Sequence, residues 1–479
     1  MITVFAVFVK AQEYKSIHQI EWEQHHHLAK MPSDYPEDGS GIIPLRGLKK
    51  PANTYVVFGY LPDWEYSHAP QYFQYDLLTH IAAFDFTVSS NGNISYPSYW
   101  PWTNIINAAH SNGVKVIMTA VNFNGDQLHT IMTDPNVKSN FFERCKAIIG
   151  AYKLDGVNVD FESLNTADRG TVVNTFMAEL TESVKDDYPD AEISFAGPAV
   201  NWGGWDLKGL ALSCDYIFIM GYAFAGGWST TSGPNAPLSG GSINISNTVN
   251  VQYGAVTPDY PEKLILGVPY YGNKWQTTTG DARSSVIDHI ESTRYSSAIY
   301  QSQSFGLLWD TASQSPWYRY QSSGDWYQVW FDDAPSLELK YNLAESKNYL
   351  GVGMWALGYD GSESGLWDLL REHYGPAKIP NLSSEYPRKF ELLQNYPNPF
   401  NSETAISYTL GTSQFKASSY VNLSIYNILG EKMITLISEK QLAGKYQVEW
   451  NASDVPSGIY FCRLKTGQED LTIKMLLNK

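Results

Sequence analysis

Short apolar runs alternate with amphipathic stretches between residues 55 and 374. Most of these runs are continuous, which is typical of parallel strands that are buried on both faces. The eight candidate strands are Tyr55–Leu61, Leu78–Phe86, Val114–Val121, Gly156–Phe161, Ile193–Ala196, Tyr216–Tyr222, Leu264–Pro269 and Gly351–Leu357. Between them lie helical patterns such as 168–187, where Val173, Phe176 and Leu180 share one side. Eight strand–helix units predict an α/β fold of the (β/α)8 TIM barrel type.

A doubly wound open sheet is the alternative topology for such a pattern, but no GxGxxG or P-loop motif supports it. The repeat is interrupted after the seventh strand, because 275–333 is too long for a simple connection. The aromatic stretches 317–320 and 326–331 predict a hairpin. We therefore expect a small insertion after strand 7, beside the mouth of the barrel.

The pattern changes at both ends of this region. Residues 1–12 resemble the remnant of a secretory signal peptide, with an apolar run at Ile2–Val9. Residues 13–50 form a polar N-terminal extension of irregular pattern, and 51–374 the predicted barrel. The proline-containing stretch 375–390 is a predicted linker. Residues 391–479 then alternate apolar and polar positions, which predicts an immunoglobulin-like β-sandwich of about seven strands.

Composition and charge exclude several classes of partner. The net charge of −16 and the lack of any basic run argue against nucleic acid and anionic membranes. No later segment is long and apolar enough to span a bilayer. The three cysteines are scattered, which disfavours a disulfide framework and a zinc site. Aromatic residues make up 14% of the chain, which suits either sugar stacking or a β-rich extracellular protein. We expect a monomer.

The candidate chemistry lies on the fourth strand. Side chains alternate along a strand, so Asn158, Asp160 and Glu162 share the face that points into the barrel. Asp160 and Glu162 would lie about 7 Å apart. The charge of Asp160 would raise the pKa of Glu162 and keep it protonated as a general acid. A salt-bridged barrel core is the alternative, but few Lys or Arg lie on these strands to pair with the acids.

Residues 155–162 resemble the DGxxxDxE signature of glycoside hydrolase family 18, the chitinase family. Four further segments resemble sequence motifs on other barrel strands of the same family, and they occur in the same order. They are Leu78–Ile81, Met220–Tyr222, Gly267–Gly272 and Gly353–Trp355. The resemblance covers the predicted barrel, and it implies a glycosidase that acts beside N-acetylglucosamine without a metal ion or organic cofactor.

The resemblance also implies a substrate-assisted retaining mechanism, in which no protein carboxylate attacks the sugar. Glu162 would be the proton donor, and the acetamido carbonyl of the substrate would attack C1. Asp160 would orient the acetamido group, Tyr222 would hydrogen-bond its oxygen, and Trp355 would stack under the sugar. The remaining positions for which the resemblance implies substrate binding are Tyr60, Phe84, Asn158, Asp155, Met220 and Tyr271.

Within the family, the sequence is more similar to the branch of spore-cortex-lytic N-acetylglucosaminidases. Asn158 stands where the common motif has a further acid, and Ala223 where many members have Asp. The family resemblance implies chitin or chitooligosaccharide as the substrate, and the similarity to this branch leaves peptidoglycan or another N-acetylglucosamine glycan as the alternative. A non-catalytic chitin-binding lectin is a further reading, although such lectins usually lose the acid that Glu162 retains. A surface protein with the barrel as scaffold is a fourth.

The C-terminal module carries a second resemblance. The segment Leu393–Asn401 (LQNYPNPFN) resembles the opening of the type IX secretion C-terminal sorting domain, and Ile425–Gly430 and Ser457–Tyr460 resemble later stations. The resemblance implies that the type IX machinery exports the protein, which would be secreted or attached to the surface of a Gram-negative cell. A carbohydrate-binding sandwich is the alternative.

Overall fold

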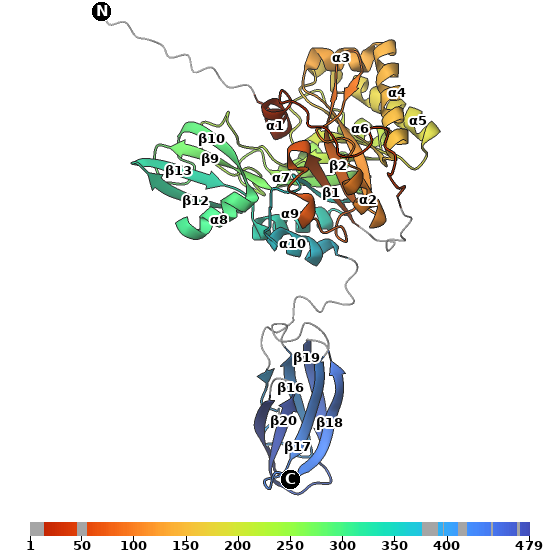
Figure 1. Ribbon diagram of the computed structural model, residues 1–479. Coiled ribbons are helices and arrows are strands. Elements are labelled where there is room, and N and C mark those ends of the chain that lie inside the picture. The colour runs from red at the N-terminus through yellow and green to blue at the C-terminus, as the bar shows by residue number, and fades with distance from the viewer. Residues whose placement is uncertain are drawn as a thin grey trace, which may run out of the picture. The chain divides into compact units, whose positions relative to one another are not determined.

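The computed structural model describes residues 14–45, 55–375, 391–395, 397–410, 419–441, 444–466 and 470–479. The chain divides into two compact units, Met1–Pro376 and Ala377–Lys479 (Figure 1). The expected signal peptide remnant lies outside the described residues, and so does the expected linker apart from Gly375.

The first unit is built on a closed parallel barrel, which confirms the predicted (β/α)8 fold. Strand β1 pairs with β14 on one side and with β2 on the other, and this closes the sheet. The barrel strands are β1 (Val56–Pro62), β2 (His80–Val88), β4 (Lys115–Asn122), β5 (Gly156–Phe161), β6 (Glu192–Pro198), β7 (Tyr216–Met220), β8 (Leu264–Pro269) and β14 (Gly351–Trp355). Short β3 (Ile94–Ser95) adds to β2 in the antiparallel sense.

Helices cover the outside of the barrel. They are α2 (Thr103–Ser111), α3 (Gly125–Thr133), α4 (Pro135–Tyr152), α5 (Thr171–Asp187), α6 (Leu207–Ser213), α7 (Ile245–Asn247), α9 (Ala334–Ser346) and α10 (Gly365–Tyr374). Phe161 of β5 points outward and packs against Phe176 of α5 and Phe141 of α4, with ring centroids 5.8 Å apart in both pairs. The polar residues that alternate with it on β5 therefore face the barrel interior.

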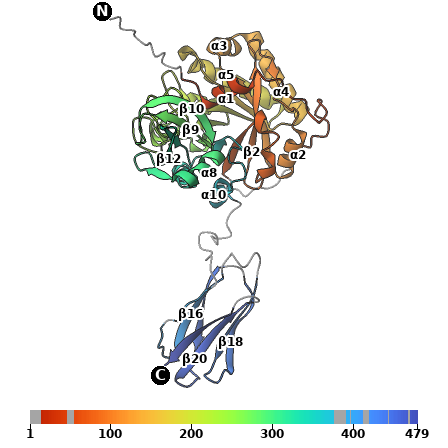
Figure 2. The same cartoon turned by 60° about the vertical axis from the view of Figure 1, so that its left-hand side comes forward.

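The insertion after the seventh barrel strand is confirmed, and it is larger than the expected hairpin. Five strands form one antiparallel sheet in the order β10-β9-β13-β12-β11, with helix α8 (Tyr295–Phe305) against it (Figure 2). The strands are β9 (Tyr271–Thr277), β10 (Val286–Arg294), β11 (Leu308–Asp310), β12 (Ser315–Ser322) and β13 (Asp325–Trp330). Trp275, Trp317 and Trp330 form its small core, with the last two rings stacked at 4.9 Å.

The N-terminal extension contains a helix that its polar pattern did not predict. Helix α1 spans Ile17–His25, and the hydroxyl of Ser16 caps it by accepting a hydrogen bond from the backbone N–H of Gln19. Its residues Ile17, His18 and Glu21 are buried. Of the three consecutive histidines 25–27, His26 and His27 are exposed, whereas His25 is half-buried and its ring stacks on Trp64 with centroids 4.1 Å apart.

The second unit is all-β, as expected. One sheet has the order β15-β16-β19 and the other β18-β17-β20-β21. The strands are β15 (Glu391–Leu392), β16 (Glu403–Leu410), β17 (Ser419–Tyr426), β18 (Lys432–Gln441), β19 (Gly444–Asn451), β20 (Gly458–Lys465) and β21 (Asp470–Leu477). Both sheets contribute to a single core, for example Ile406 from β16 and Leu423 from β17. Among the described residues, no helix has the length and apolar character needed to cross a membrane.

A buried ion pair joins the end of the insertion to helix α9. The ammonium of Lys340 contacts the carboxylate of Asp332, and both side chains are almost completely buried. The hydroxyl of Ser336 also donates to Asp332, at 2.7 Å, and Asp333 caps the start of α9. This pair fixes where the chain leaves the insertion and returns to the barrel.

We predict that Lys340→Ala destabilises the first unit by about 3–5 kcal/mol, because it leaves the carboxylate of Asp332 buried without its cation. Glu338→Ala is the matched control on the exposed side of the same helix, and it should change stability by less than about 0.5 kcal/mol. Urea unfolding followed by tryptophan fluorescence measures both. Equal effects of the two substitutions would contradict a structural role for the pair.

Candidate active site

Strand β5 places three polar residues at the centre of the barrel. Asn158 and Asp160 are fully buried on its inward face, and Glu162 follows directly after the strand ends, with its side chain 10% exposed. Asn158 accepts a hydrogen bond from the Tyr60 hydroxyl at 2.8 Å and donates to Ser194 at 2.9 Å. The amide is therefore held by β1 and β6, on either side of the barrel interior.

Aromatic rings surround these carboxyl groups. Trp355, the last residue of β14, is completely buried, and its ring lies 4.9 Å from Phe84 and 5.5 Å from Tyr60. Tyr222 follows β7, and its ring lies 6.2 Å from that of Tyr271 at the start of β9. Carboxyl ends of different strands thus bring together residues that are far apart in the sequence.

Two of the candidate residues do not belong to this group of carboxyl groups and aromatic rings. Met220 ends β7 and is half-buried, two residues before Tyr222. Asp155 precedes β5, at the opposite end of the strand from Glu162. Its carboxylate accepts hydrogen bonds from the backbone N–H of Val116 at 2.7 Å and from His110 Nε2 at 2.9 Å. The structure does not bring Asp155 to the other candidates, because the strand itself separates it from the mouth.

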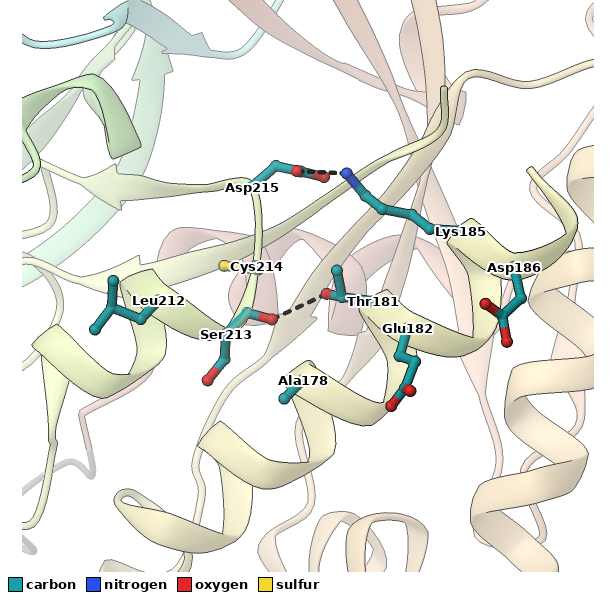
Figure 3. Close-up of a pocket in the computed structure, with 9 residues that line it drawn as sticks. All are labelled: Ala178, Thr181, Glu182, Lys185, Asp186, Leu212, Ser213, Cys214 and Asp215. Carbon is teal, nitrogen blue, oxygen red and sulfur yellow. Dashed lines mark hydrogen bonds and ion pairs between the residues drawn. The ribbon is translucent and has the colours of Figure 1, made fainter. Parts of the chain in front are cut away.

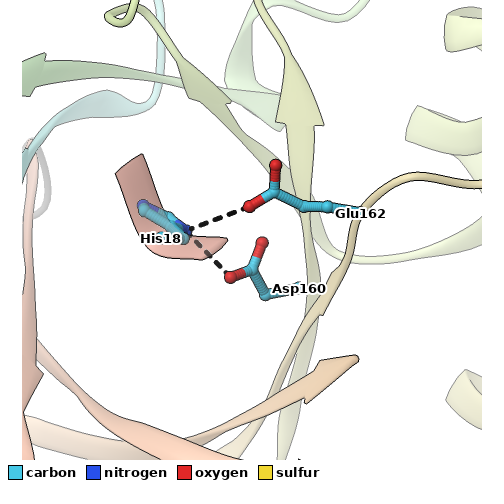
Figure 4. Close-up of side chains that lie close together, drawn as sticks. All are labelled: His18, Asp160 and Glu162. Atoms are coloured by element: carbon cyan, nitrogen blue, oxygen red, sulfur yellow. Dashed lines mark hydrogen bonds and ion pairs between the residues drawn. The ribbon is translucent and has the colours of Figure 1, made fainter. Parts of the chain in front are cut away.

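The residue that sequence reasoning missed is His18 of helix α1. Its Nδ1 lies 2.8 Å from Asp160 Oδ2 (Figure 4). Its Nε2 lies 2.8 Å from the Tyr222 hydroxyl. The imidazole lies over the Trp355 ring, with centroids 3.8 Å apart and planes inclined by 31°. The only local sign in the sequence is Ser16, a helix-capping residue type ahead of a short stretch with Ile17 and Glu21 four apart.

Burial dominates the electrostatics of the site. It raises the pKa of Glu162 to about 8, with the charge of Asp160 as the second cause, while His18 and a hydrogen bond from Ser16 act in the opposite direction. The expected effect of Asp160 is present, but loss of solvent is larger. Burial also holds the pKa of Asp160 well above its usual range and lowers the pKa of His18 to about 4.

Not every polar atom of the site has a hydrogen-bond partner among the described residues. A neutral imidazole has one N–H and one acceptor nitrogen, so His18 can satisfy Asp160 and Tyr222 together. In contrast, Asp160 Oδ1 is buried and has no hydrogen-bond partner among the residues that the structure describes. A buried polar atom without a partner costs roughly 1–3 kcal/mol, so the site retains an unused acceptor.

The same cluster contains ligand types that could hold a metal ion. One donor atom each from His18, Asp160 and Glu162 lies within 4.8 Å of the others. Within the described ranges this is the single group of three such residues that meets this spacing. A bound cation would have to replace the direct contact between His18 and Asp160.

Two surface concavities lie away from the carboxyl groups. One, of about 350 Å³, lies between α5 and α6, where Lys185 pairs with Asp215 at 2.6 Å (Figure 3). The only cation among its described lining residues, Lys185, is held by Asp215, and Glu182 and Asp186 also line it. The other, of about 720 Å³, lies between the chain after β7 and the insertion, and its lining includes Phe224, Trp228 and Arg283.

Comparisons with known proteins agree with this geometry. Residues 56–360 match the family described as Glycosyl hydrolases family 18, and residues 394–478 match the Secretion system C-terminal sorting domain. Both resemblances predicted from the sequence are confirmed. The sorting domain indicates export by type IX secretion, so the protein is secreted or held at the surface of a Gram-negative cell.

Three similar proteins illustrate the relationship. The cortical fragment-lytic enzyme of Bacillus subtilis (strain 168) is 24% identical over 315 residues, which cover 63% of this chain and 69% of that protein. Human di-N-acetylchitobiase is 24% identical over 303 residues, covering 55% and 74%. The crystal structure of a GH18 chitinase from Cycas revoluta in complex with (GlcNAc)3 matches with a TM-score of 0.59 and 18% identity, covering 67% of this chain and all of that one.

We predict that Glu162→Gln raises the thermal stability of the protein at alkaline pH. The pKa of Glu162 is higher in the folded state, at about 8, than in the unfolded chain, so its ionisation removes stability as the pH rises from about 4.5 to 8. Glutamine has no charge to desolvate. The gain should be near zero at pH 4.5 and approach about 5 kcal/mol above pH 8, at about 1.4 kcal/mol for each pH unit between the two pKa values.

Scanning calorimetry at several pH values measures this difference. Glu182→Gln, at an exposed position on α5, is the matched control and should give no pH-dependent gain. A gain for Glu162→Gln that does not change with pH would contradict the raised pKa.

Proposed function

The chain belongs to glycosyl hydrolase family 18, and on this premise we propose that it hydrolyses β-1,4 bonds beside N-acetylglucosamine by substrate-assisted retaining catalysis. One observation carries the proposal. Asp160 and Tyr222 hydrogen-bond to two edges of the same planar ring, and that ring lies on Trp355. A sugar stacked on the indole would present the N–H and C=O of its acetamido group to the same two side chains.

Glu162 supplies the proton in this scheme. A carboxyl with a pKa of about 8 is mostly protonated at neutral pH, which a general acid requires. Its proton passes to the glycosidic oxygen as the bond from that oxygen to C1 breaks. The acetamido carbonyl oxygen forms the new bond to C1 and gives an oxazolinium ion. Glu162, now ionised, takes a proton from water as the water oxygen bonds to C1. The bond from C1 to the acetamido oxygen breaks in the same step, which regenerates the acetamido group, and the configuration is retained.

Asp160 would act on the acetamido nitrogen. Its unpartnered Oδ1 is a buried acceptor that a substrate N–H could satisfy. The negative charge of Asp160 would stabilise the positive charge that develops on the oxazolinium ion. Tyr222 would donate to the carbonyl oxygen and hold it on the line of attack.

The other candidates take supporting roles in the proposal. Tyr60 and Phe84 would complete the aromatic surface next to Trp355, since their rings lie within 5.5 Å and 4.9 Å of it. Asn158 would hold Tyr60 in place through its 2.8 Å hydrogen bond. Tyr271 and Met220 would border the substrate near Tyr222. Asp155 has no substrate-binding role here, because it lies at the other end of β5.

Chitooligosaccharides are the substrates that we propose first, since di-N-acetylchitobiase and a chitinase are among the similar proteins. Peptidoglycan is the second candidate, supported by the similarity to the cortical fragment-lytic enzyme. Both polymers lie outside the cytoplasm, which fits the sorting domain.

We predict that Glu162→Gln lowers kcat on N-acetylglucosamine tetramer by about 10²–10⁴-fold, because the amide cannot donate a proton to the leaving oxygen. The Kd for the tetramer should change little. Product analysis by mass spectrometry and binding by calorimetry measure the two effects, with Glu182→Gln as the control that keeps the wild-type rate. Unchanged hydrolysis by Glu162→Gln would contradict the assignment.

A second prediction tests the role of the acetamido group. The fully deacetylated glucosamine tetramer has no carbonyl oxygen to attack C1, so its cleavage should fall below detection while the acetylated tetramer is cut. Purified peptidoglycan, assayed in parallel for new reducing ends, distinguishes the two candidate polymers. Cleavage of both tetramers at similar rates would rule out substrate assistance.

A further inference from the structure

The N-terminal segment of residues 14–30, which we call the covering segment, contacts each polar group that the proposed mechanism needs. His18 hydrogen-bonds to Asp160 and Tyr222, and the Ser16 hydroxyl donates to Glu162 Oε1 at 2.7 Å. His18 also lies on the ring of Trp355. A glycan cannot occupy the position proposed for its acetamido-bearing sugar while these contacts exist.

The imidazole of His18 is chemically similar to the group that it would exclude. Its ring is completely buried, and each ring nitrogen lies 2.8 Å from one hydrogen-bond partner, Asp160 on one edge and Tyr222 on the other. A neutral imidazole offers one N–H and one acceptor nitrogen on a flat ring, and an acetamido group offers one N–H and one acceptor oxygen in a plane. The ring thus uses the same donor and acceptor positions of Asp160 and Tyr222.

Further side chains anchor the covering segment along the mouth of the barrel. Glu21 accepts hydrogen bonds from Trp355 Nε1 and from the Tyr359 hydroxyl, both at 2.8 Å. The indole N–H of Trp22 donates to Thr87 at 3.0 Å. The ammonium of Lys30 lies between two buried carboxylates of the barrel, Asp63 at 3.1 Å and Asp85 at 3.2 Å.

The covering segment also extends toward the second concavity. The ring of Tyr14 lies edge-on to Trp228, with centroids 4.8 Å apart, and Trp228 lines that concavity. The contacts therefore run from Trp228 on one side of the carboxyl groups to Asp63 on the other.

Two features favour release of the covering segment from the mouth of the barrel. Burial raises the pKa of Glu21 to about 7, so docking carries the cost of placing a carboxyl away from water, and Asp160 Oδ1 stays without a partner in the described structure. The chain directly after α1 is accessible, with Leu28 54% and Met31 51% exposed. A partner or a protease can therefore reach the covering segment while it is docked.

We propose that the covering segment is an autoinhibitory element, which occupies the proposed sugar position through His18 and Ser16 and must leave before a glycan can bind. This inference rests on the proposed function, because it assigns the covered groups to catalysis. The apparent affinity for substrate is then lower than the intrinsic affinity, because only the molecules with an undocked covering segment can bind. Displacement by a partner, or cleavage in the exposed chain after α1, would activate the enzyme.

The first test removes the anchors from the full-length protein. We expect His18→Ala with Glu21→Ala to raise kcat/KM on N-acetylglucosamine tetramer by about tenfold or more, because the docked fraction falls. His27→Ala is the matched control. Among the described residues, its ring contacts Glu23 O and His26 of its own segment, and the substitution should leave the rate unchanged. A chelator in every assay removes any cation bound at His18, Asp160 and Glu162.

Amide hydrogen exchange of residues 17–25 reports docking independently of turnover. Exchange should be slow in the wild type and in His27→Ala, and fast in the double variant. Faster exchange with a lower or equal kcat/KM would overturn the proposal, because the covering segment would then be a part of the working site. Slow exchange in the double variant with no gain in rate would overturn the inference that these two side chains hold it in place.

A second measurement uses tetramer binding in the Glu162→Gln background, which needs no hydrolysis. The double variant should bind the tetramer about tenfold more tightly than Glu162→Gln alone. Equal affinities would count against occlusion and leave the proposed function standing. Tighter binding with no hydrolysis by any protein that retains Glu162 would instead count against the proposed function and leave occlusion standing.

A recognition sequence for a site-specific protease, inserted between Leu28 and Ala29, tests activation while keeping every anchor side chain, including Lys30. Cleavage of the full-length protein at this site should raise the rate on the tetramer by a factor similar to that of the double variant. The same protein left uncut is the control. A cut protein from which residues 14–27 dissociate, with no change in rate, would also overturn the proposal.

Discussion

The burial of two carboxyl groups at the end of one barrel strand is the constraint on which the rest of the structure depends. Asp160 is fully enclosed and Glu162 nearly so, and their pKa values rise mainly because water is excluded. Burial of acids is unfavourable unless partners are supplied. His18 hydrogen-bonds to Asp160 and Ser16 to Glu162, while Tyr60 and Ser194, from two other strands, hold the neighbouring Asn158.

The closed barrel makes this concentration of groups possible. Parallel strands all end at one mouth, so residues that follow β5, β7, β8 and β14 meet there although nearly two hundred positions separate them. The insertion adds Tyr271 at the start of its first strand and builds one side of the neighbouring concavity. The buried ion pair between Lys340 and Asp332 holds the end of the insertion against helix α9, from which the chain re-enters the barrel.

The covering segment can be understood from the same constraint. An open mouth would leave Asp160, Tyr222 and Trp355 ready for a sugar, whereas His18 gives them a partner with similar hydrogen-bonding groups. For a hydrolase that is exported by a C-terminal sorting domain, a covered site would limit activity until the protein reaches its glycan. Regulation and catalysis would then share one set of contacts.

The sequence by itself determined the elements and the face of β5 that carries the chemistry. Continuous apolar runs fixed the barrel, and the alternation of side chains placed Asn158, Asp160 and Glu162 on one side, because these features depend only on local periodicity. Motifs of adjacent residues could also be recognised from the sequence, including the Leu393–Asn401 segment of the sorting domain.

Only the tertiary structure decided which distant groups meet. His18 lies 142 positions from Asp160 and 204 from Tyr222, in a stretch whose polar pattern predicted no structure. Asp155 belongs to the signature motif, yet the rise of the strand carries it away from the mouth. The larger cause of the raised pKa of Glu162 is solvent exclusion, which depends on everything packed around it. Periodicity acts over a few residues, whereas enclosure and long-range contact are properties of the whole fold.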